Sequence, residues 1–590
     1  MQLTYTGARH LDQGHTEIAE KTWRRAVQLD PNCVTAWSLL TDLYEKAGRE
    51  EEAVKALNRW IACGEKTGQN LLALGNRSCT LKQFEQGKAL VRQALQLDPS
   101  LKIPVGLVIA KAENLQGNWE AAVLELNEIL QAEPDNTIAL EIRCHCWFQL
   151  GWIPESVADH RRCLAAQPDA LRHSRLVLML NYLAESTPEQ TYEESVRWSN
   201  IYAEPLAGEI VAHPNVPDPE RRLKIGYLSP DLRNHAIMKL LPAVFEKYDR
   251  ENFQVFAYSV NTKGDNVTDY VKRTIGDFVD LPVSRKAIAE RVRADGIDIL
   301  VDLAGHTMHA DALLAYAMKP APVQVTWLGF LATTGMRTMD YFIGDAYMPH
   351  PGTEHCFSEK VYRLPRAPGA YRPPGDPGLG LPPVFKNGYI TFGCFNDPRK
   401  ITHDAVKLWS ILLHLHRDAK LFLKYKSLDR EIAQRRIRGW FADYGISMER
   451  IVFEGSSLPL EYLSRYSQID IALDPIPYTG GTTTLDALWM GVPVVTLAGR
   501  LPAASCGASL LAAAGLPFAN TPEEYLALAN QLVKTMPASP NIRHEIRKAM
   551  MKSPLMDEVG LIRAVEAAYR DMWRTWCKEK TATADEKRIA

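Results

Sequence analysis

The stretch ALDPIPYTGGTTTLDALWMGVPVVTLAG (472–499) decides the fold of the second half of this chain. An apolar run ends at Asp474, a turn-rich segment reaches Gly480 and Gly481, and three threonines then begin a helical pattern that carries Asp486. A second apolar run, VPVVTLAG, follows the helix. This order of strand, turn, helix and strand is typical of a parallel sheet covered by helices.

The turn in this stretch predicts a site for an anion. Glycines let the backbone approach a ligand closely, and threonine hydroxyls beside the free amides of a helix amino end suit a diphosphate. A plain helix cap is the alternative, but a single threonine is enough for a cap. We therefore expect Gly480, Gly481, Thr482 and Thr483 to contact phosphate groups.

Apolar runs alternate with helical patterns throughout residues 222–577. The runs LKIGYLSPD, FQVFAYSV, DILVDLAGHT, PVQVTWLGF and KVYRLP predict the strands of a first lobe (222–383). The runs YITFGCFN, AKLFLKYK, RIVFEG, IDIALDPIPY and VPVVTLAG predict those of a second lobe (384–577), which ends in a closing helix. Two α/β lobes of this kind bind ligands in a cleft at the carboxyl ends of their strands. Because neither G-x-G-x-x-G after the first strand nor G-x-x-x-x-G-K-[ST] occurs, a dehydrogenase and a phosphate-loop NTPase are disfavoured.

The first 170 residues repeat. Pro31, Pro99, Pro134 and Pro168 close similar helical segments, and their separations of 68, 35 and 34 residues fit a period of about 34. Small and aromatic residues recur at the spacings at which a tetratricopeptide repeat buries its two helices: Ala19, Trp23, Ala26, Trp37, Leu40, Tyr44, Ala53, Leu57, Ala94 and Ala122. We expect about four full repeats and one partial repeat, forming an α-superhelix that binds extended peptide or protein.

Two further segments complete the predicted organisation. Residues 171–221 are expected to be a helical linker that ends in the proline-rich sequence HPNVPDPERR. Residues 578–590, TATADEKRIA and the three before it, are expected to be a flexible tail.

Composition narrows the class of protein. The net charge of −2 predicts no attraction to nucleic acid or an anionic membrane. No apolar stretch approaches about 18 residues, and the first residues lack the basic and apolar regions of a signal peptide. Ten scattered cysteines without zinc-ligand spacing fit reduced thiols, so we expect a soluble, cytoplasmic protein. The sequence leaves a homodimer open.

Two strand-end loops offer candidates for chemistry. The loop GCFNDPRKIT (393–402) carries Asn396 and Lys400, and a lysine there could stabilise a departing diphosphate, although such a lysine is otherwise a solvated surface residue. The loop SPDLRNHAIMKLL (229–241) carries His235, whose imidazole could contact an acceptor hydroxyl. Helix capping or packing is an equal alternative for His235.

Two more strand ends are expected to face the acceptor side of the cleft. DLAGHT (302–307) supplies His306, and WLGFLATTGMRTMDY (327–341) supplies Thr333, Thr334 and Gly335. The sequence assigns none of these to a chemical step.

Residues 223–577 resemble the O-GlcNAc transferase family, including its bacterial members and the plant SPINDLY branch. The segments that carry the resemblance are GYLSPDLRNH, DILVDLAGHT, KPAPVQVTWLGF, TFGCFNDPRKIT, DIALDPIPYTGGTTTLDALWMGVPVVTLAG and AAYRDMWRTWC. The resemblance implies an inverting glycosyltransferase-B fold with the nucleotide in the second lobe and no need for a metal or other cofactor. No DxD-type metal motif lies at the predicted cleft, which agrees with this expectation.

The resemblance also implies roles for individual residues. Lys400 matches the lysine that contacts the donor diphosphate, and Thr482 and Thr483 match the phosphate-contacting threonines. Asp486 matches an acidic residue expected at the nucleotide ribose, and His235 matches a histidine near the sugar and the acceptor.

The remaining donor-site expectations are Asn396 in the lysine loop, Arg465 and Tyr462. Arg465 matches an arginine that lines the nucleotide site, and Tyr462 stands where animal enzymes have a histidine. Gly481 replaces the histidine that lies against the base, while Asp397 replaces a glutamine.

These departures bear on the donor, and Lys239 is another, since animal enzymes have a second histidine there. The expected function is transfer of GlcNAc from UDP-GlcNAc to Ser or Thr of proteins held by the repeats. One alternative is GDP-fucose as donor, as in the SPINDLY branch, whose AYRxMW sequence occurs here. A second alternative is a non-catalytic scaffold.

Overall fold

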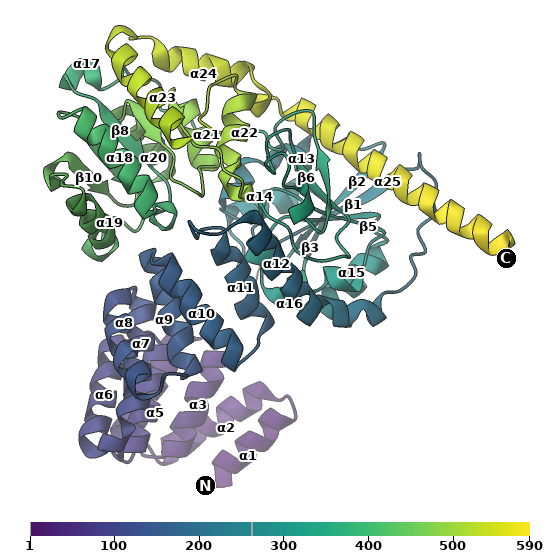
Figure 1. The fold of residues 1–590 in the computed structure, drawn as a ribbon. Coiled ribbons are helices and arrows are strands. Elements are labelled where there is room, and N and C mark those ends of the chain that lie inside the picture. Colours follow the sequence, from purple (N-terminus) through teal and green to yellow (C-terminus); the bar gives the residue numbers. More distant parts are fainter. Residues whose placement is uncertain (1, 261–262, 590) are drawn as a thin grey trace. The chain divides into compact units, whose positions relative to one another are not determined.

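The computed structural model describes residues 2–260 and 263–589, with side chains up to residue 582 (Figure 1). Internal contacts divide the chain into two compact units, Met1–Gln167 and Pro168–Ala590. The predicted repeat array ended at residue 170, close to this division. The two units are described separately.

The first unit is helical throughout its described residues. Its helices form successive antiparallel pairs: α1 (Gln2–Asp12) with α2 (Thr16–Leu29), α3 (Val34–Lys46) with α4 (Glu50–Cys63), α5 (Gly68–Thr80) with α6 (Phe84–Leu97), α7 (Lys102–Gln116) with α8 (Trp119–Ala132), and α9 (Thr137–Leu150) with α10 (Ile153–Ala166). The predicted alanine and aromatic anchors lie in its core, and Trp23 and Ala53 are fully buried. The predicted repeat architecture is therefore confirmed.

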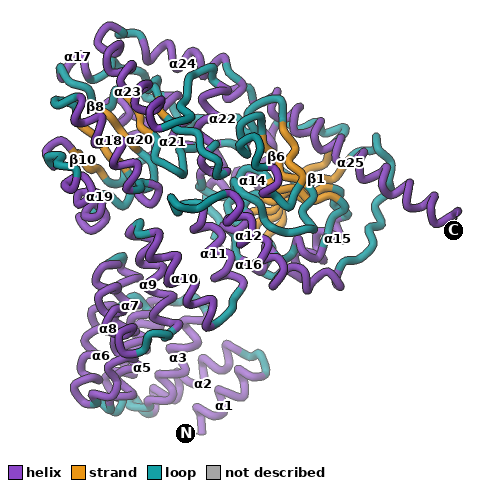
Figure 2. Tube along the Cα trace, viewed as in Figure 1, coloured by secondary structure: helices purple, strands orange, loops and turns teal. Residues whose placement is uncertain are grey.

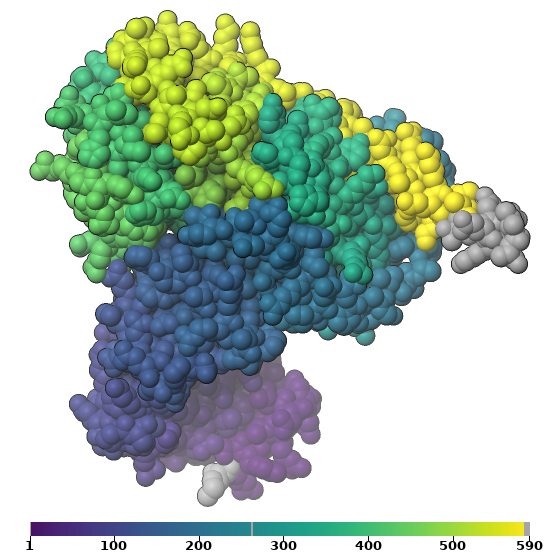
Figure 3. Space-filling view, viewed as in Figure 1, coloured from purple at the N-terminus to yellow at the C-terminus, as the bar shows by residue number. Residues whose placement is uncertain are grey.

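The second unit begins with the segment predicted as a linker. It folds into α11 (Ala170–Leu180) and α12 (Pro188–Trp198), and Thr187 and Gln190 form a capping box at the start of α12. Trp198 is fully buried and donates its indole N–H to the carbonyl of Ala170 at 2.8 Å, which ties the two helices together. In Figure 3 this blue segment lies against the teal first lobe.

The first lobe contains a seven-stranded parallel sheet in the order β3-β2-β1-β4-β5-β6-β7. The strands are β1 (Leu223–Ser229), β2 (Phe253–Ser259), β3 (Asp277–Asp280), β4 (Ile299–Asp302), β5 (Val323–Thr326), β6 (Tyr341–Gly344) and β7 (Lys360–Arg363). Its helices are α13 (Pro242–Glu246), α14 (Asn266–Thr274), α15 (Arg285–Asp295) and α16 (Ala310–Leu313). Strands β3 and β6 were not predicted: β3 has an aspartate at each end and is only partly buried, and β6 begins at the end of the segment interpreted as a loop.

The second lobe contains a five-stranded parallel sheet in the order β10-β9-β8-β11-β12. The strands are β8 (Thr391–Cys394), β9 (Lys420–Lys424), β10 (Ile451–Glu454), β11 (Ile471–Leu473) and β12 (Val494–Val495). The helices are α17 (Val384–Asn387), α18 (His403–Leu415), α19 (Glu431–Asp443), α20 (Pro459–Ser464), α21 (Thr482–Trp489), α22 (Cys506–Ala513), α23 (Pro522–Thr535) and α24 (Ile542–Lys552). Figure 2 shows the strands, in orange, as two separate groups.

Strand order places the expected ligand site. In the second lobe the strand order reverses between β8 and β11, which lie side by side and parallel although β9 and β10 intervene in sequence. Ligands of doubly wound sheets bind at such a reversal, outside the carboxyl ends of the strands. The loop after β8 carries Lys400, and the loop after β11 carries Gly480.

The last helix, α25 (Glu558–Ile589), does not belong to the second lobe as predicted. It crosses back to the first lobe (Figure 1), where its residues from Leu561 to Cys577 join the core around β1, β2 and β5. Tyr569 and Tyr227 of β1 share a hydrogen bond of 3.1 Å between their hydroxyls. The helix continues to Ile589, through the segment expected to be a tail. Among the described residues, no helix combines the length and apolar character that a bilayer crossing requires.

Candidate active site

Asp474, which directly follows β11, organises the turn that leads to α21. Its carboxylate is buried and accepts hydrogen bonds from the Thr484 hydroxyl at 3.2 and 3.3 Å and from the Asn396 amide at 3.4 Å. Burial raises the pKa of Asp474, and the nearby Thr496 hydroxyl and Lys400 charge, together with hydrogen bonds from the Gly480 backbone and Thr484, oppose that rise. The buried carboxylate therefore links the loop after β8 to the loop after β11.

The turn leaves no space for a side chain at Gly480. A Cβ placed on it would lie 2.3 Å from Thr484 Oγ1 and 2.6 Å from Asp474 Oδ1. A Cβ on Gly481 would meet only Cys506 Sγ, at 3.7 Å, an ordinary contact. The two glycines thus have different roles: Gly480 admits the tight turn around Asp474, whereas Gly481 leaves space beside α22.

The amino end of α21 carries the expected threonines. Thr483 donates its hydroxyl to Asn396 Oδ1 at 2.8 Å, while in the described parts of the chain the Thr482 hydroxyl makes no hydrogen bond. No side chain caps the helix at Gly481. The first amides of a helix have no acceptor within the helix, so this uncapped end has the hydrogen-bonding capacity that an anion needs.

Lys400 lies beside this helix end. Its ammonium donates to the carbonyl oxygen of Thr479 at 3.1 Å and lies 3.9 Å from the centre of the Tyr478 ring. Both partners are uncharged, and among the described residues no carboxylate forms an ion pair with Lys400. Burial lowers the pKa of Lys400, and the more distant charge of Asp397 opposes this. Instead of pairing with Lys400, Asp397 pairs with Arg399.

Asp486, which was expected to contact the nucleotide ribose, is instead bound by side chains from outside the second lobe. Its buried carboxylate accepts from the ammonium of Lys239 at 2.9 and 3.0 Å and from the hydroxyl of Tyr371. Lys239 comes from the loop after β1, and Tyr371 from the segment that joins the lobes. Helix α21, the first lobe and the segment between the lobes therefore meet at the ion pair of Lys239 with the buried carboxylate of Asp486.

Tyr462 and Arg465 lie on either side of the end of α20. Tyr462 is next to the Lys239 ammonium, at 6.0 Å from the ring centre, and shares a 3.2 Å hydrogen bond with Tyr466, which donates to the carbonyl of Thr483. Arg465 lies with Glu454 and Glu461, at 2.9 and 3.3 Å. Tyr462 thus joins the group around Asp486, while Arg465 is engaged by acidic neighbours.

His235, the other expected catalytic residue, caps a short helical turn in the first lobe. Its Nδ1 accepts from the backbone N–H of Ile237 at 3.5 Å, and its side chain is 46% exposed. A neutral imidazole that accepts at Nδ1 carries its proton on Nε2. Nδ1 also lies 3.9 Å from Asp231 Oδ2, to which a protonated Nδ1 would donate, so these contacts allow either ring nitrogen to carry the proton.

The four residues expected at the acceptor side are buried, so the expectation that they face the cleft is corrected. His306 shares hydrogen bonds with Ser174 of α11 at 2.6 Å and with the carbonyl of Thr334 at 3.0 Å, and burial lowers its pKa to about 4. The hydroxyls of Thr333 and Thr334 donate to buried Glu359. A Cβ on Gly335 would meet the backbone of Ser195 in α12 at 2.3 Å. The physical reason is that α11 and α12 cover these loops at the carboxyl ends of the strands. The sequence analysis had assigned both helices to a linker.

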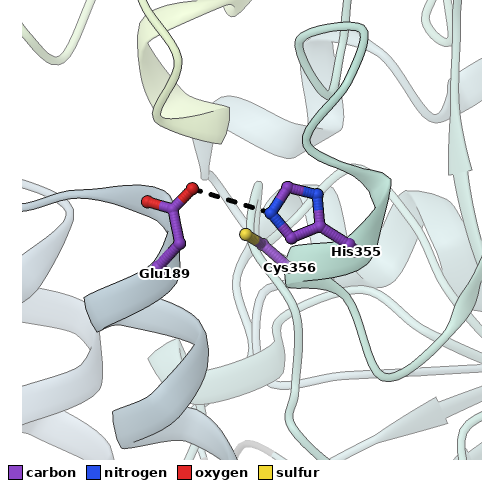
Figure 4. A group of neighbouring side chains, drawn as sticks. All are labelled: Glu189, His355 and Cys356. Atoms are coloured by element: carbon purple, nitrogen blue, oxygen red, sulfur yellow. Dashed lines mark ion pairs between the residues drawn. The ribbon is translucent and has the colours of Figure 1, made fainter.

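One group of side chains has the composition of a metal site. Glu189 of α12 and the adjacent His355 and Cys356 place their ligand atoms within 4.8 Å of one another (Figure 4). However, Arg500 is already paired with Glu189 at 2.9 Å, and His355 lies 3.6 Å from the same oxygen. A guanidinium at this distance repels a second cation, so the charge arrangement favours an ion pair over a metal.

Several contacts of this site were not predicted from the sequence. Lys239 and Tyr371 bind Asp486 from distant segments, and no local pattern marks such a pairing. Asp474 was recognised as a strand end but not as the acceptor that joins two loops, and Tyr478 could have been noticed as the aromatic residue nearest the glycines. Tyr182, whose ring centre lies 4.8 Å from that of Tyr478, comes from the supposed linker.

The chain was compared with known proteins. The model of glycosyl transferase family 41 matches residues 209–368 and 383–562, and a tetratricopeptide repeat model matches residues 7–66. The Solanum lycopersicum protein named "Probable UDP-N-acetylglucosamine--peptide N-acetylglucosaminyltransferase SPINDLY" is 35% identical over 414 residues, which are 68% of this chain and 44% of that protein. The Arabidopsis thaliana protein of the same title but named SEC is 32% identical over 378 residues, 60% of this chain and 38% of that protein.

This chain therefore spans less than half the length of these curated relatives. A solved structure of a mutant O-GlcNAc transferase from Thermobaculum terrenum is 32% identical, with a TM-score of 0.77, and the match covers 87% of this chain and 99% of that one. That match supports the expected two-lobed glycosyltransferase-B architecture behind helical repeats. The chain belongs to glycosyl transferase family 41.

Proposed function

We propose that this chain transfers a sugar from a nucleotide donor to Ser or Thr hydroxyls of proteins, with UDP-GlcNAc as the donor. The observation that carries the proposal is the unpaired ammonium of Lys400 beside the uncapped amino end of α21. A half-buried cation to which the described residues supply no counter-ion, next to free helix amides, suits a diphosphate. The names of the relatives, which include UDP-N-acetylglucosamine and peptide, agree with this donor and acceptor.

In the proposed reaction the acceptor hydroxyl oxygen attacks the anomeric carbon on the face opposite the nucleotide. The bond from that carbon to the diphosphate oxygen breaks, and the diphosphate leaves with the electron pair. Lys400, the Thr482 hydroxyl and the amides of α21 stabilise the charge that develops on the leaving oxygen. Loss of one such preorganised donor costs about 10²–10³ in rate in well-studied enzymes.

The hydroxyl proton must leave during this step. His235, whose side chain is 46% exposed, is one candidate to take it. A phosphate oxygen of the donor or a water relay is the alternative. The proposed reaction uses no metal, as the family resemblance implies.

The repeat unit supplies the proposed route for protein substrates. A stack of helical pairs with exposed side chains between the pairs binds extended segments of protein in many repeat proteins. We propose the cytoplasm as the compartment, on the composition of the sequence, and leave the homodimer as a proposal that size measurement in solution can test.

The donor can be identified directly. The chain is co-expressed with bacterial proteins, and Ser and Thr modifications are read by mass spectrometry, with the Lys400→Ala variant as control. A hexosamine increment that is lost in Lys400→Ala supports UDP-GlcNAc. A deoxyhexose increment would instead assign GDP-fucose, the alternative suggested by the AYRxMW sequence shared with the SPINDLY branch.

Thermal-shift measurements with UDP and GDP provide an independent readout of the base. We expect UDP to raise the melting temperature more than GDP does, since a ligand stabilises the state that binds it. If neither nucleotide shifts the melting temperature and no modification is found, the proposed function is wrong and a scaffold is the better interpretation.

A further inference from the structure

The position of Lys400 depends on an aromatic side chain. The Lys400 ammonium lies 3.9 Å from the centre of the Tyr478 ring and donates to the carbonyl of the next residue, Thr479. The face of an aromatic ring attracts a cation, most strongly where water is excluded. Ring and carbonyl therefore hold the charge in place without neutralising it, which leaves it available to a diphosphate.

Tyr478 is in turn in contact with a residue from outside both lobes. Tyr182 follows α11 by two residues, and its ring centre lies 4.8 Å from that of Tyr478, with the planes tilted by 50°. Aromatic pairs at this distance stabilise each other by packing and by quadrupole attraction. Burial raises the pKa of Tyr182 to about 12, so the side chain is a neutral phenol at physiological pH.

Tyr182 is held on a firmly attached segment. Ser174 of α11 shares a hydrogen bond of 2.6 Å with His306 of the first lobe, and the backbone N–H of Tyr182 donates to Met179 at 2.9 Å. Tyr182 therefore reaches the second lobe from a helix that is anchored on the first. Its side chain contacts the second lobe at Tyr478, the ring against which Lys400 lies.

We propose that Tyr182 is a positioning residue for the transfer reaction, fixing the Tyr478 ring against which Lys400 is held. The segment between the repeats and the catalytic lobes is then a wall of the donor site. This inference rests on the proposed function, since Lys400 is assigned there to the leaving diphosphate. The alternative is that the Tyr182–Tyr478 contact is packing alone, with no effect on Lys400.

Four substitutions separate these interpretations: Tyr182→Phe, Tyr182→Ala, Tyr478→Phe and Tyr478→Ala. The phenylalanine variants keep the rings, so we expect kcat within about twofold of the wild type. The alanine variants free the lysine, so we expect kcat to fall about tenfold, with the donor KM changed less than kcat. Rescue by phenylalanine shows that the ring, not the hydroxyl, is needed.

A matched control is available in the same segment. Tyr202 is half-buried, with its ring 6.0 Å from Trp198 and 5.8 Å from His173, and it packs without reaching Lys400. Tyr202→Ala is expected to lower the melting temperature as the alanine variants do, but to leave the pH profile of kcat unchanged. In Tyr182→Ala the alkaline limb of that profile should move to higher pH, because water that reaches Lys400 relieves the burial that lowers its pKa.

A second readout does not require transfer. Competitive labelling with acetic anhydride across a pH series, read by peptide mass spectrometry, reports the titration of Lys400 against exposed Lys407 in the same sample. We expect Lys400 to titrate below Lys407 in the wild type and in Tyr182→Phe, and to move towards Lys407 in Tyr182→Ala. Equal Lys400 profiles in the wild type and Tyr182→Ala overturn the inference. An absence of sugar transfer by the wild type, with the labelling difference present, counts instead against the proposed function alone.

Discussion

Two turns of similar, threonine-rich sequence differ in how far their hydrogen-bonding groups are used inside the protein. The first-lobe turn, ATTG (332–335), follows β5, and the second-lobe turn, TGGTTT (479–484), follows β11. In the first, both threonine hydroxyls donate to Glu359 inside the protein. In the second, Thr483 and Thr484 have internal acceptors, but Thr482 and the helix end are left open.

The difference shows that residue type alone does not distinguish a binding loop from a structural one. A buried acceptor, Glu359, satisfies the first-lobe turn, and α11 and α12 cover it. The second-lobe turn uses its buried acceptor, Asp474, to fix the backbone and leaves hydrogen-bonding capacity over. Unused polar capacity next to an unpaired cation is the feature that marks the site, and four predictions test it.

Lys400→Ala gives the largest expected effect. Removing the ammonium should lower kcat by about 10²–10³ while leaving the fold intact, because to the described residues the ammonium makes one hydrogen bond and one ring contact. Steady-state transfer and circular dichroism measure both quantities. Lys407→Ala, at an exposed position of the neighbouring α18, is the matched control and should retain activity. Near-normal turnover of Lys400→Ala would remove the lysine from the mechanism.

The structural role of the first-lobe turn predicts a dependence of stability on pH. His306 has a pKa lowered from 6.5 to about 4 by burial, so the unfolded chain binds the proton more readily between these values. Stability is then fully present above pH 6.5 and falls as the pH drops towards 4, by about 3 kcal/mol. Urea unfolding at a series of pH values measures it. His306→Gln should flatten this dependence, and an unchanged slope would contradict the assignment.

Gly480→Ala should damage the second-lobe turn. The added methyl group meets Thr484 Oγ1 and Asp474 Oδ1, so the backbone must shift, at a cost of about 1–3 kcal/mol. Because Asp474 and Thr484 set the start of α21, nucleotide binding should weaken as well. Thermal unfolding and UDP titration report the two effects. Wild-type values for both would show that the turn can relax around the methyl group.

Gly481→Ala, at the next position, is expected to have the smallest effect. The new methyl group makes an ordinary contact with Cys506 Sγ, so stability should change by less than about 0.5 kcal/mol. The same two measurements apply, which makes this variant the control for Gly480→Ala. A large loss of UDP binding with unchanged stability would place Gly481 against the ligand.

Much of this architecture could be predicted from sequence. The 34-residue period and the alternation of apolar runs require only local regularity, so the repeats and ten of the twelve strands in the described residues were predicted. The glycines, threonines and Lys400 could be proposed as site residues because they lie in two short segments at strand ends. Features that depend on distant pairing were not predictable: Lys239 with Asp486, Tyr182 with Tyr478, and the covering of His306 by α11.

The path of α25 has a consequence for how the protein is made. Residues 561–577 complete the core of the first lobe, although the whole second lobe precedes them in the chain. During synthesis one apolar face of the first sheet therefore stays uncovered until the second lobe and α25 have left the ribosome. Arg372, between the lobes, then links Glu246 of the first lobe to Glu558 at the start of α25. A nascent chain of this kind is exposed to chaperones for longest at the lobe that is synthesised first.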